Sequence, residues 1–208
     1  MKAFPVTPLF CFLVTAVLAL PACRHAAPPA AQLPSPAAAD LPLPDAIPGA
    51  FTVRQKLVAH SSHGGGSFEA VLKKSPATLT LLGLTPYGSR AFLLEQKGAE
   101  VTFTSYIPRD LPFSPTFVLQ DVHRVFDAPL GAELPEGDRE GVVKDNLIRE
   151  HWHQGRLQSR SYGPREPVAA PPTVTITYDG TGPAGLASHV LLTHHALGYT
   201  LAVETLPM

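Results

Sequence analysis

Residues 51–57 read Phe-Thr-Val-Arg-Gln-Lys-Leu, and this stretch sets the pattern that decides the fold. Every second position falls on one side of an extended backbone: Phe51, Val53, Gln55 and Leu57. The positions between them carry Thr, Arg and Lys. Because successive side chains of a strand point to opposite faces of a sheet, this repeat of two predicts a β-strand with one mainly apolar face.

The same period continues along the chain. It predicts four further strands, at 68–73, 78–81, 92–95 and 101–104. Turn-forming Gly and Pro separate these runs at 64–66, 75–76, 86–88 and 97–98. Connections this short allow only hairpins, so we expect an antiparallel meander.

At Ser114 and Pro115 the period changes. Ser114 is a favourable N-cap residue, and Pro115 suits the first position of a helix. Apolar side chains then follow at helical spacing, and Pro129 ends the run. These apolar residues are Val118, Leu119, Val122, Val125 and Phe126. We therefore expect one amphipathic helix that covers part of the sheet.

Beyond a polar segment at 131–141, for which we expect no strand, the period of two returns. It predicts strands at 147–153, 157–162, 174–178, 190–194 and 199–205, hairpin turns at 154–155 and 196–198, and a loop at 164–172. About nine or ten strands and one helix indicate a mainly β protein (α+β), with a curved antiparallel sheet that forms a half-open barrel. One helix covers only part of so large a sheet. The other inward apolar positions therefore meet either a folded-over sheet or an unfilled cavity.

The N-terminus has the features of a secretion signal. Lys2 precedes an uncharged apolar run at 10–20, which is shorter than the ~20 residues of a membrane-spanning helix. Leu20-Pro21-Ala22-Cys23 then resembles the lipobox of bacterial lipoproteins, in which diacylglycerol is attached to the cysteine sulfur and the chain is cleaved before the cysteine. The resemblance implies a lipid anchor on Cys23, and the alternative is an ordinary signal peptide with an incidental cysteine. The other cysteine, Cys11, lies in the removed run, so Cys23 keeps no disulfide partner.

Residues 24–48 consist mostly of Ala and Pro, a composition that favours extended backbone over a packed core. The predicted organisation is a signal peptide at 1–22, a lipidated cysteine with its tether at 23–48, and one folded domain at 49–208. Arg24 stands where lipoproteins retained in the inner membrane of enterobacteria carry Asp, so the resemblance implies an outer-membrane anchor facing the periplasm. A net charge of −1 gives no sign of a nucleic-acid partner.

Four parts of the folded domain carry short motifs: Leu-Gly-Leu-Thr-Pro-Tyr-Gly at 82–88, Phe92, Leu-Gln-Asp-Val at 119–122 and Gly-Tyr-Thr-Leu at 198–201. They resemble an uncharacterised family of bacterial lipoproteins whose genes often lie in clusters for aryl polyene pigments. The chain departs from the family at 126–129, where Phe-Asp-Ala-Pro replaces an expected Trp-Pro pair. The family is similar to the LolA/LolB lipoprotein carriers, whose half-open barrel and helical lid bind acyl chains. The resemblance implies a carrier or acceptor of a hydrophobic molecule, and it transfers no site residue.

The inward apolar positions are the candidate binding residues. They either form plain core or line a cavity for a hydrophobic ligand beneath the helix: Leu79, Leu81, Phe92, Leu94, Val101, Phe103, Val118 and Leu119. The first hypothesis is an outer-membrane lipoprotein that binds an acyl chain, a lipoprotein or an aryl polyene lipid, without a cofactor. The alternative is a non-enzymatic module that docks an envelope protein through an apolar face or an open strand edge. An enzyme acting on lipid is a third reading.

Motifs for catalysis are missing from the sequence. It contains no G-x-S-x-G nucleophile elbow, no phosphate-binding loop and no H-E-x-x-H zinc motif, so we expect no enzyme. His151 and His153 would share a face of a strand and could begin a zinc site, but histidines on the sheet surface are the preferred interpretation. His194 and His195 point to opposite faces. We therefore expect no metal site.

Two charged positions have open interpretations. Asp121 lies among the apolar residues of the predicted helix. It is either a solvated residue paired with Arg124 or Arg90, or a polar latch that pins the helix over the sheet. Arg109 and Asp110 are expected to form an ion pair in a loop.

Overall fold

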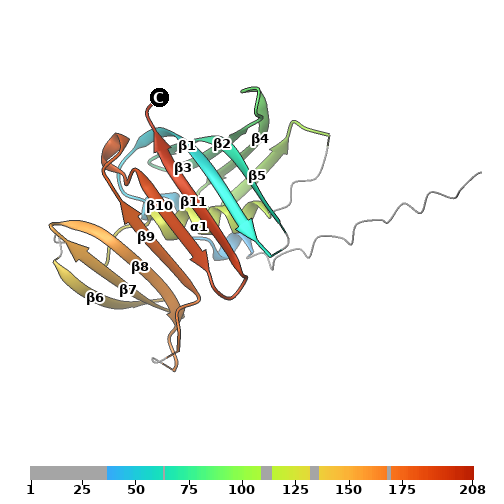
Figure 1. The fold of residues 1–208 in the computed structure, drawn as a ribbon. Helices are drawn as coiled ribbons and strands as arrows, with labels where there is room; N and C mark the ends of the chain where they lie inside the picture. The colour runs from blue at the N-terminus through green and yellow to red at the C-terminus, as the bar shows by residue number, and fades with distance from the viewer. Residues whose placement is uncertain (1–36, 63, 109–113, 132–135, 168–169) are drawn as a thin grey trace, which may run out of the picture.

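The computed structural model describes residues 37–62, 64–108, 114–131, 136–167 and 170–208 (Figure 1). The β-strands are β1 (Phe51–Ser61), β2 (Gly64–Ser75), β3 (Thr78–Leu84), β4 (Arg90–Lys97), β5 (Glu100–Ser105), β6 (Gly137–Val143), β7 (Asn146–His153), β8 (Arg156–Pro164), β9 (Val174–Asp179), β10 (His189–His194) and β11 (Tyr199–Leu206). The helix α1 spans Pro115–Phe126, and the short 3-10 helices are η1 (Ala38–Asp40), η2 (Pro44–Ala46) and η3 (Pro183–Gly185). The described residues therefore contain eleven strands and one α-helix.

All eleven strands join one antiparallel sheet in the order β5-β4-β3-β2-β1-β11-β10-β9-β8-β7-β6. Strands that follow one another in sequence are neighbours, as hairpin connections predict, except β5 and β6. One further pairing joins strands that are far apart in the sequence. The first strand, β1, pairs with the last, β11, from Arg54 with Leu206 to Ser61 with Tyr199. This pairing lies at the centre of the sheet and leaves β5 and β6 at its two edges.

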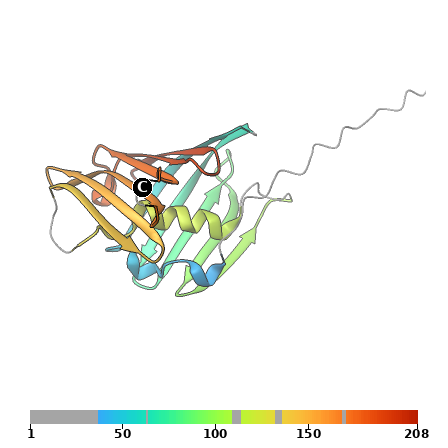
Figure 2. The same ribbon diagram turned by 90° about the horizontal axis from the view of Figure 1, so that it is seen from below.

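Helix α1 follows β5 in the chain and precedes β6, so it connects the two edges. Figure 2 shows the sheet curved around the helix, which lies across the concave side. Ser114 has an extended backbone before the helix, and Pro115 occupies its first turn, as expected for these residue types. The prediction of a mainly β protein with a curved open sheet and one covering helix is confirmed.

The side of the sheet that faces α1, here called the inner face, carries the core. On β1 the buried residues are Val53, Gln55 and Leu57, while the residues between them are exposed. This alternation is the one that residues 51–57 predicted from their period of two. Strands β3, β4, β9 and β10 show the same alternation, and their buried side chains join one core cluster with Leu119 and Val125 of α1.

The expectation of no strand at 131–141 is wrong. Strand β6 pairs with β7 over its whole length, from Gly137 with Trp152 to Val143 with Asn146. Its side chains include Asp138, Arg139 and Glu140, and no residue of β6 is buried. An edge strand of this kind is held by its backbone ladder, so it lacks the apolar alternation on which a sequence-based prediction depends.

Packing also begins before Gly49, the predicted start of the domain. Leu41 and Ile47 are buried in the core cluster. The amide of Ala128 donates to the carbonyl of Ala46 at 2.9 Å, which ties this segment to the end of α1. The end of the predicted tether is therefore part of the domain.

Residues 1–36 lie outside the described part of the chain, so the signal peptide and the anchor on Cys23 remain predictions. The predicted Arg109–Asp110 pair lies outside it as well. Within the described residues, no helix combines the length and the apolar character needed to cross a membrane.

Candidate functional site

The structure brings the eight predicted binding residues together on the inner face and on α1. Five are buried: Leu79, Leu81, Phe92, Leu94 and Leu119. Val101 and Val118 are half-buried against the same core cluster, and Phe103 is 38% exposed. The residues of the set on β3 and β4 are thus buried, whereas Phe103 on the edge strand β5 contacts solvent.

A row of aromatic rings marks this open end. The ring of Phe92 lies 6.1 Å from that of Phe68 on β2 and 6.1 Å from that of Phe103 on β5, measured between centroids. Gly83 of β3 is the cross-strand partner of Phe92. Because Gly83 has no side chain, the ring of Phe92 can lie over its backbone.

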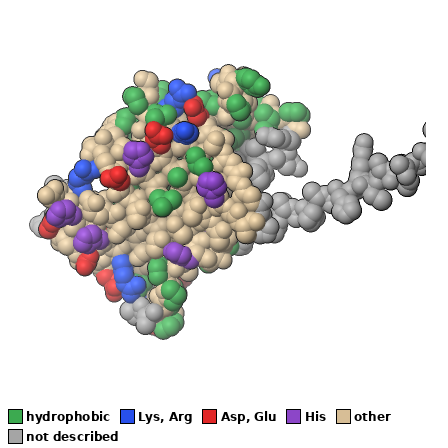
Figure 3. All heavy atoms as spheres, viewed as in Figure 1, with side chains coloured by type: hydrophobic (Ala, Val, Ile, Leu, Met, Phe, Trp, Pro, Cys, Tyr) green, Lys and Arg blue, Asp and Glu red, His purple; other side chains and the backbone are tan. Residues whose placement is uncertain are grey.

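Two shallow hollows of the described residues open on the other side of the sheet, the outer face seen in Figure 3. One is lined by Lys56, Val58, Asp179, Leu191, Ala202 and Glu204, among others. The second is more polar and lies over β6, β7 and β8. The inner face is covered by α1 in this conformation, and Leu119 and Val125 of the helix belong to its core cluster.

At its centre α1 is held by a buried polar contact of Asp121, and nearer its N-terminal end by ring contacts of Phe117. Asp121 is buried, and its carboxylate accepts hydrogen bonds from the hydroxyl of Tyr199 on β11 and from Nη1 of Arg124, the latter at 3.0 Å. Burial raises the pKa of Asp121 above its usual value, although Tyr199 and Arg124 partly oppose this effect. The reading of Asp121 as a solvated residue is wrong; its expected pairing with Arg124 is confirmed, and the contact with Tyr199 gives it the geometry of a latch.

His194 of β10 completes this contact region. Its ring stacks on Tyr199 at 5.2 Å and lies 5.9 Å from the ring of Phe117 on α1. The amide of Leu197 donates to Nδ1 of His194 at 3.2 Å, which requires an unprotonated Nδ1. Burial, aided by the positive charge of Arg124, lowers the pKa of His194 to about 4, so the ring is neutral at pH 7.

In the last turn of the helix, His123 connects α1 to β4. Its Nε2 lies 2.9 Å from Oε1 of Gln96, and its Nδ1 lies 2.9 Å from Oδ1 of Asp127. The amide of Gln96 is oriented by two bonds from Nε2, to the carbonyls of Pro42 at 2.7 Å and Gly98 at 3.2 Å. The side chain of Gln96 on β4 therefore contacts both the helix and the N-terminal segment.

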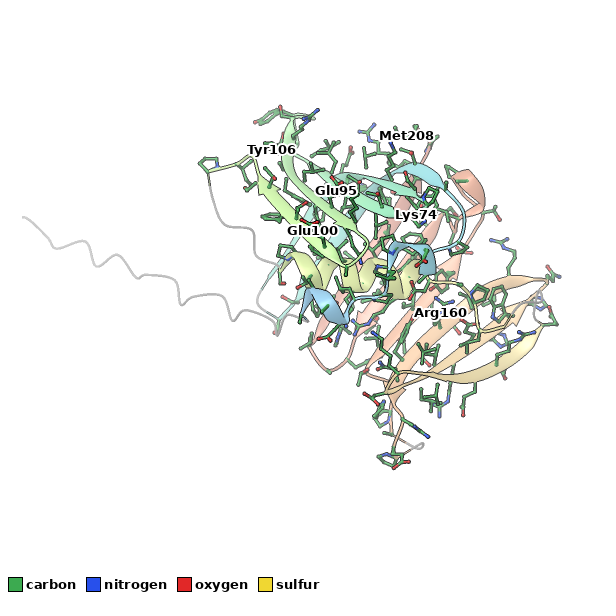
Figure 4. The ribbon with its side chains drawn as sticks, turned by 180° about the vertical axis from the view of Figure 1, so that it is seen from behind. Lys74, Glu95, Glu100, Tyr106, Arg160 and Met208 are labelled. Atoms are coloured by element: carbon green, nitrogen blue, oxygen red, sulfur yellow. The ribbon has the colours of Figure 1, made fainter. Side chains whose placement is uncertain are left out.

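The C-terminal end of α1 is bound by a buried ion pair. Arg160 of β8 pairs with Glu150 of β7 at 2.6 Å, and both side chains are fully buried. The guanidinium of Arg160 also donates to the carbonyls of Asp127 at 3.0 Å and of Ala128 at 3.3 Å, where a helix end presents unpaired carbonyls. Figure 4 shows Arg160 beside the helix, in the half of the sheet that contains β8. A cation at this position also interacts favourably with the helix dipole.

Two tyrosines add further bonds to the same end. Tyr162 donates to the carbonyl of Arg124 at 2.9 Å, and Tyr178 donates to that of Val125 at 3.0 Å. Burial raises the pKa of Tyr162 to about 12 and raises that of Tyr178 as well, so both hydroxyls keep their protons. The C-terminal end of α1 therefore has many more polar contacts with the sheet than the N-terminal end.

His151, His153 and His195 lie apart from these contacts. His151 and His153 are exposed on β7, where they pair with Asp138 at 2.7 Å and Glu136 at 3.2 Å. His195 is exposed and bonds to Thr175, so it points away from buried His194. In the described ranges, no group of three or more His, Cys, Asp or Glu residues is arranged to hold a metal ion.

Sequence reasoning missed the polar residues that hold the helix. Arg160 and Glu150 occupy inward positions of their strands, where the period of two predicts apolar side chains. Gln55 and Gln96 do the same on β1 and β4. The sequence did show polar residues at strand positions that should face the core. It could not show which residue each of them would bind.

Comparisons with known proteins give a family and a fold likeness. The family model described as "Protein of unknown function (DUF3261)" matches residues 52–207. Among curated proteins, none matches the chain in sequence.

Three solved structures are similar in fold, each at 10% sequence identity. A LolA superfamily protein from Nitrosomonas europaea has a TM-score of 0.43 and covers 81% of this chain and 88% of its own. A candidate outer membrane lipoprotein-sorting protein domain from Vibrio parahaemolyticus has a TM-score of 0.39, with coverages of 76% and 83%. A DUF1329 family protein from Desulfovibrio piger has a TM-score of 0.33, with coverages of 74% and 82%.

Proposed function

Because the chain belongs to the DUF3261 family, whose function is unknown, we propose a function from the geometry of its inner face. We propose that the protein is a non-enzymatic carrier or acceptor that binds a hydrophobic cargo on the inner face when α1 moves away. The observation that carries this proposal is that one short helix, joined to the two sheet edges by connecting segments, is the main cover of an inner face whose buried side chains are mostly apolar.

Exchange of the helix for a cargo is energetically feasible. The apolar side chains of α1 bury surface against the inner face, and an acyl chain in their place would bury surface of the same kind at about 25 cal/mol per Å². The apolar contribution is therefore similar in the closed and loaded states. The difference between them lies mainly in the polar contacts of α1.

Those contacts are unevenly distributed, and this sets the direction of opening. Near the N-terminal end they are ring contacts of Phe117 with His194 and Tyr199, and the Asp121–Tyr199 bond lies at the centre of the helix. At the C-terminal end they include Arg160, Tyr162 and Tyr178. We propose that α1 pivots about its C-terminal end and that its N-terminal end lifts, which exposes the inner face from the open edge near Phe103.

The finer assignments follow from the sequence resemblances. The lipobox supports a lipid anchor on Cys23 and a position in the outer membrane, facing the periplasm. The family motifs support an acyl chain, an acylated protein or an aryl polyene lipid as cargo. A permanent anchor would keep the carrier at the membrane while its domain exchanges cargo.

Native mass spectrometry of the full chain tests the proposal. The protein would be produced in a bacterial envelope, purified in a non-ionic detergent and analysed before and after lipid extraction. A stoichiometric hydrophobic adduct is expected. A clean mass, with no uptake of added monopalmitoylglycerol, would contradict the carrier function.

A matched pair of variants locates the adduct. Phe103 is 38% exposed on the inner side of β5, and Leu191 is 45% exposed on the outer face of β10. Since both side chains already contact solvent, an Asp at either position should leave the fold intact. Phe103→Asp should lose the adduct and Leu191→Asp should keep it, and the reverse result would place the cargo on the outer face.

A second candidate function has its own support. The outer hollow contains Leu191, Ala202 and Val58 within a ring of charged residues, a mixture typical of protein–protein contacts. The covered inner face fits an interaction module equally well. Under this alternative an envelope protein docks on the outer face, and Leu191→Asp would abolish its capture by the full chain.

A further inference from the structure

Two polar atoms on the inner face stand out because they have no partner. Gln55 of β1 and Thr205 of β11 are direct cross-strand neighbours at the centre of the sheet. They are 3% and 6% exposed. Within the described part of the chain, Nε2 of Gln55 and Oγ1 of Thr205 make no hydrogen bond.

Other buried polar side chains on this face are satisfied. Gln96 bonds to His123 and to two carbonyls, Arg160 pairs with Glu150, and Nζ of Lys74 donates to the carbonyl of Ser75 at 2.7 Å. An apolar pair of the same shape would avoid the cost of burying two unpaired polar atoms. Gln55 and Thr205 therefore call for an explanation other than stability of the closed state.

The row of residues beside Gln55 indicates where a ligand of these two polar atoms would lie. In register across the sheet, Gln55 is followed by Ala70 on β2, Gly83 on β3 and Phe92 on β4. Ala70 and Gly83 are the small members, and the ring of Phe92 lies over Gly83. The small residues Ala70 and Gly83 thus lie between the two unpaired polar atoms and the half-exposed region around Phe103. The ring of Phe92 lies across this row.

We propose that Gln55 and Thr205 form a polar subsite that binds the carbonyl oxygen of an acyl ester or amide, with the acyl chain along Ala70 and Gly83. The amide N–H of Gln55 and the hydroxyl of Thr205 can each donate to one lone pair of that oxygen. Phe92 moves off Gly83 as the chain enters. This inference rests on the proposed carrier function and specifies the chemistry of its cargo.

A neutral carbonyl fits the subsite better than a carboxylate. A buried carboxylate would need a cation as partner. Two cations of the elements packed on this face are engaged: Lys74 bonds to the carbonyls of Gly49 and Ser75, and Arg124 pairs with Asp121. The subsite therefore selects uncharged acyl esters or amides over free fatty acids.

The test compares two lipids that differ in the carbonyl. Native mass spectrometry of the full chain would give the affinities for 1-monopalmitoylglycerol and for its ether analogue 1-O-hexadecylglycerol. The wild type should prefer the ester by about tenfold, as expected for one well-placed hydrogen-bonding group. The double variant Gln55→Met/Thr205→Val should lose this preference while its affinity for the ether stays unchanged. Thr177→Val, an exposed change on the outer face, is the control and should keep the preference.

The outcomes separate this inference from the carrier function. If the wild type binds both lipids equally, or the double variant keeps the preference for the ester, the subsite is wrong while the carrier function stands. If the wild type binds neither lipid, the carrier function fails and the subsite fails with it.

Thermal unfolding adds an independent check. The double variant should melt at the same temperature or higher, because it removes two unpaired polar atoms. A drop of about 5 °C or more would show that Gln55 and Thr205 are satisfied in the closed state, for example by a buried water, and would overturn the subsite.

Discussion

The ring of Phe92 lies so close over Gly83 that a Cβ atom added at Gly83 would be 2.1 Å from Cε1 of the ring. Glycine at this position is therefore required by the neighbouring strand and not by its own backbone angles. It fixes the place of Phe92 in the aromatic row of the inner face.

Gly83→Ala should displace the ring of Phe92 and lower the free energy of unfolding by about 1–3 kcal/mol, the usual cost of overpacking. Urea denaturation measures the change. Gly66→Ala on β2 is the control, because a Cβ there would meet nothing within 4 Å. Equal stabilities of the two variants would contradict the close contact.

Tyr199→Phe removes the hydroxyl that donates to buried Asp121 and leaves the carboxylate with Arg124. We expect a loss of about 1–3 kcal/mol, because a buried acceptor loses a charge-assisted bond. Faster hydrogen exchange should appear in the N-terminal half of α1 before the C-terminal half. Tyr87→Phe, at a fully exposed turn, should change neither quantity.

Arg160→Met should be the most destabilising of these variants. It leaves Glu150 charged and buried, for which about 3–5 kcal/mol is typical. The double variant Arg160→Met/Glu150→Gln should recover part of the loss, since it removes the unpaired charge. Arg54→Met breaks the exposed Arg54–Glu69 pair and should cost less than about 1 kcal/mol. Similar losses at the two arginines would contradict the buried role of Arg160.

Acid should weaken the fold through His194. Its pKa is about 4 in the folded protein against an unperturbed value of 6.5, so the unfolded chain binds more protons between these values. This contribution to stability is complete above pH 6.5 and is lost as the pH falls towards 4. His194→Phe should give a flatter profile of urea midpoint between pH 7 and pH 4.5.

Neighbouring groups enter that comparison. Arg124 and His195 add positive charge near His194, and the raised pKa of Asp121 has the opposite effect, since it favours the folded state at low pH. These groups remain in the variant, so the difference between the two profiles isolates His194. Loss of the bond from Leu197 shifts the variant by a constant amount and does not alter the slope. Parallel profiles would contradict a neutral, buried His194.

The fold followed from local patterns to a large extent. The period of two in stretches such as 51–57 and the cap at Ser114 and Pro115 correctly predicted ten of the strands and α1. Strand β6 was missed because its residues have no buried face. The pairing of β1 with β11 could not be predicted, since no local pattern says which distant strands meet.

The candidate site was predicted less completely. Alternation placed the eight apolar residues on the inner face, because burial of one face is what the pattern records. Whether they bind a cargo remains a prediction, as does the lipid anchor on Cys23. The contacts that hold α1, such as His123 with Gln96, depend on three-dimensional neighbours and left no spacing signal in the sequence.

The central pairing of β1 with β11 also bears on how the chain reaches its native state. Each half of the sheet can form from hairpins, but the ladder that joins the two halves forms only after the last strand is available. This raises the contact order, and folding should be slow for that reason. A chain that crosses a membrane N-terminus first would therefore complete its sheet only after its final residues have emerged. Export would then deliver an unfinished half-sheet with an exposed apolar face, which is a substrate for chaperones or for aggregation.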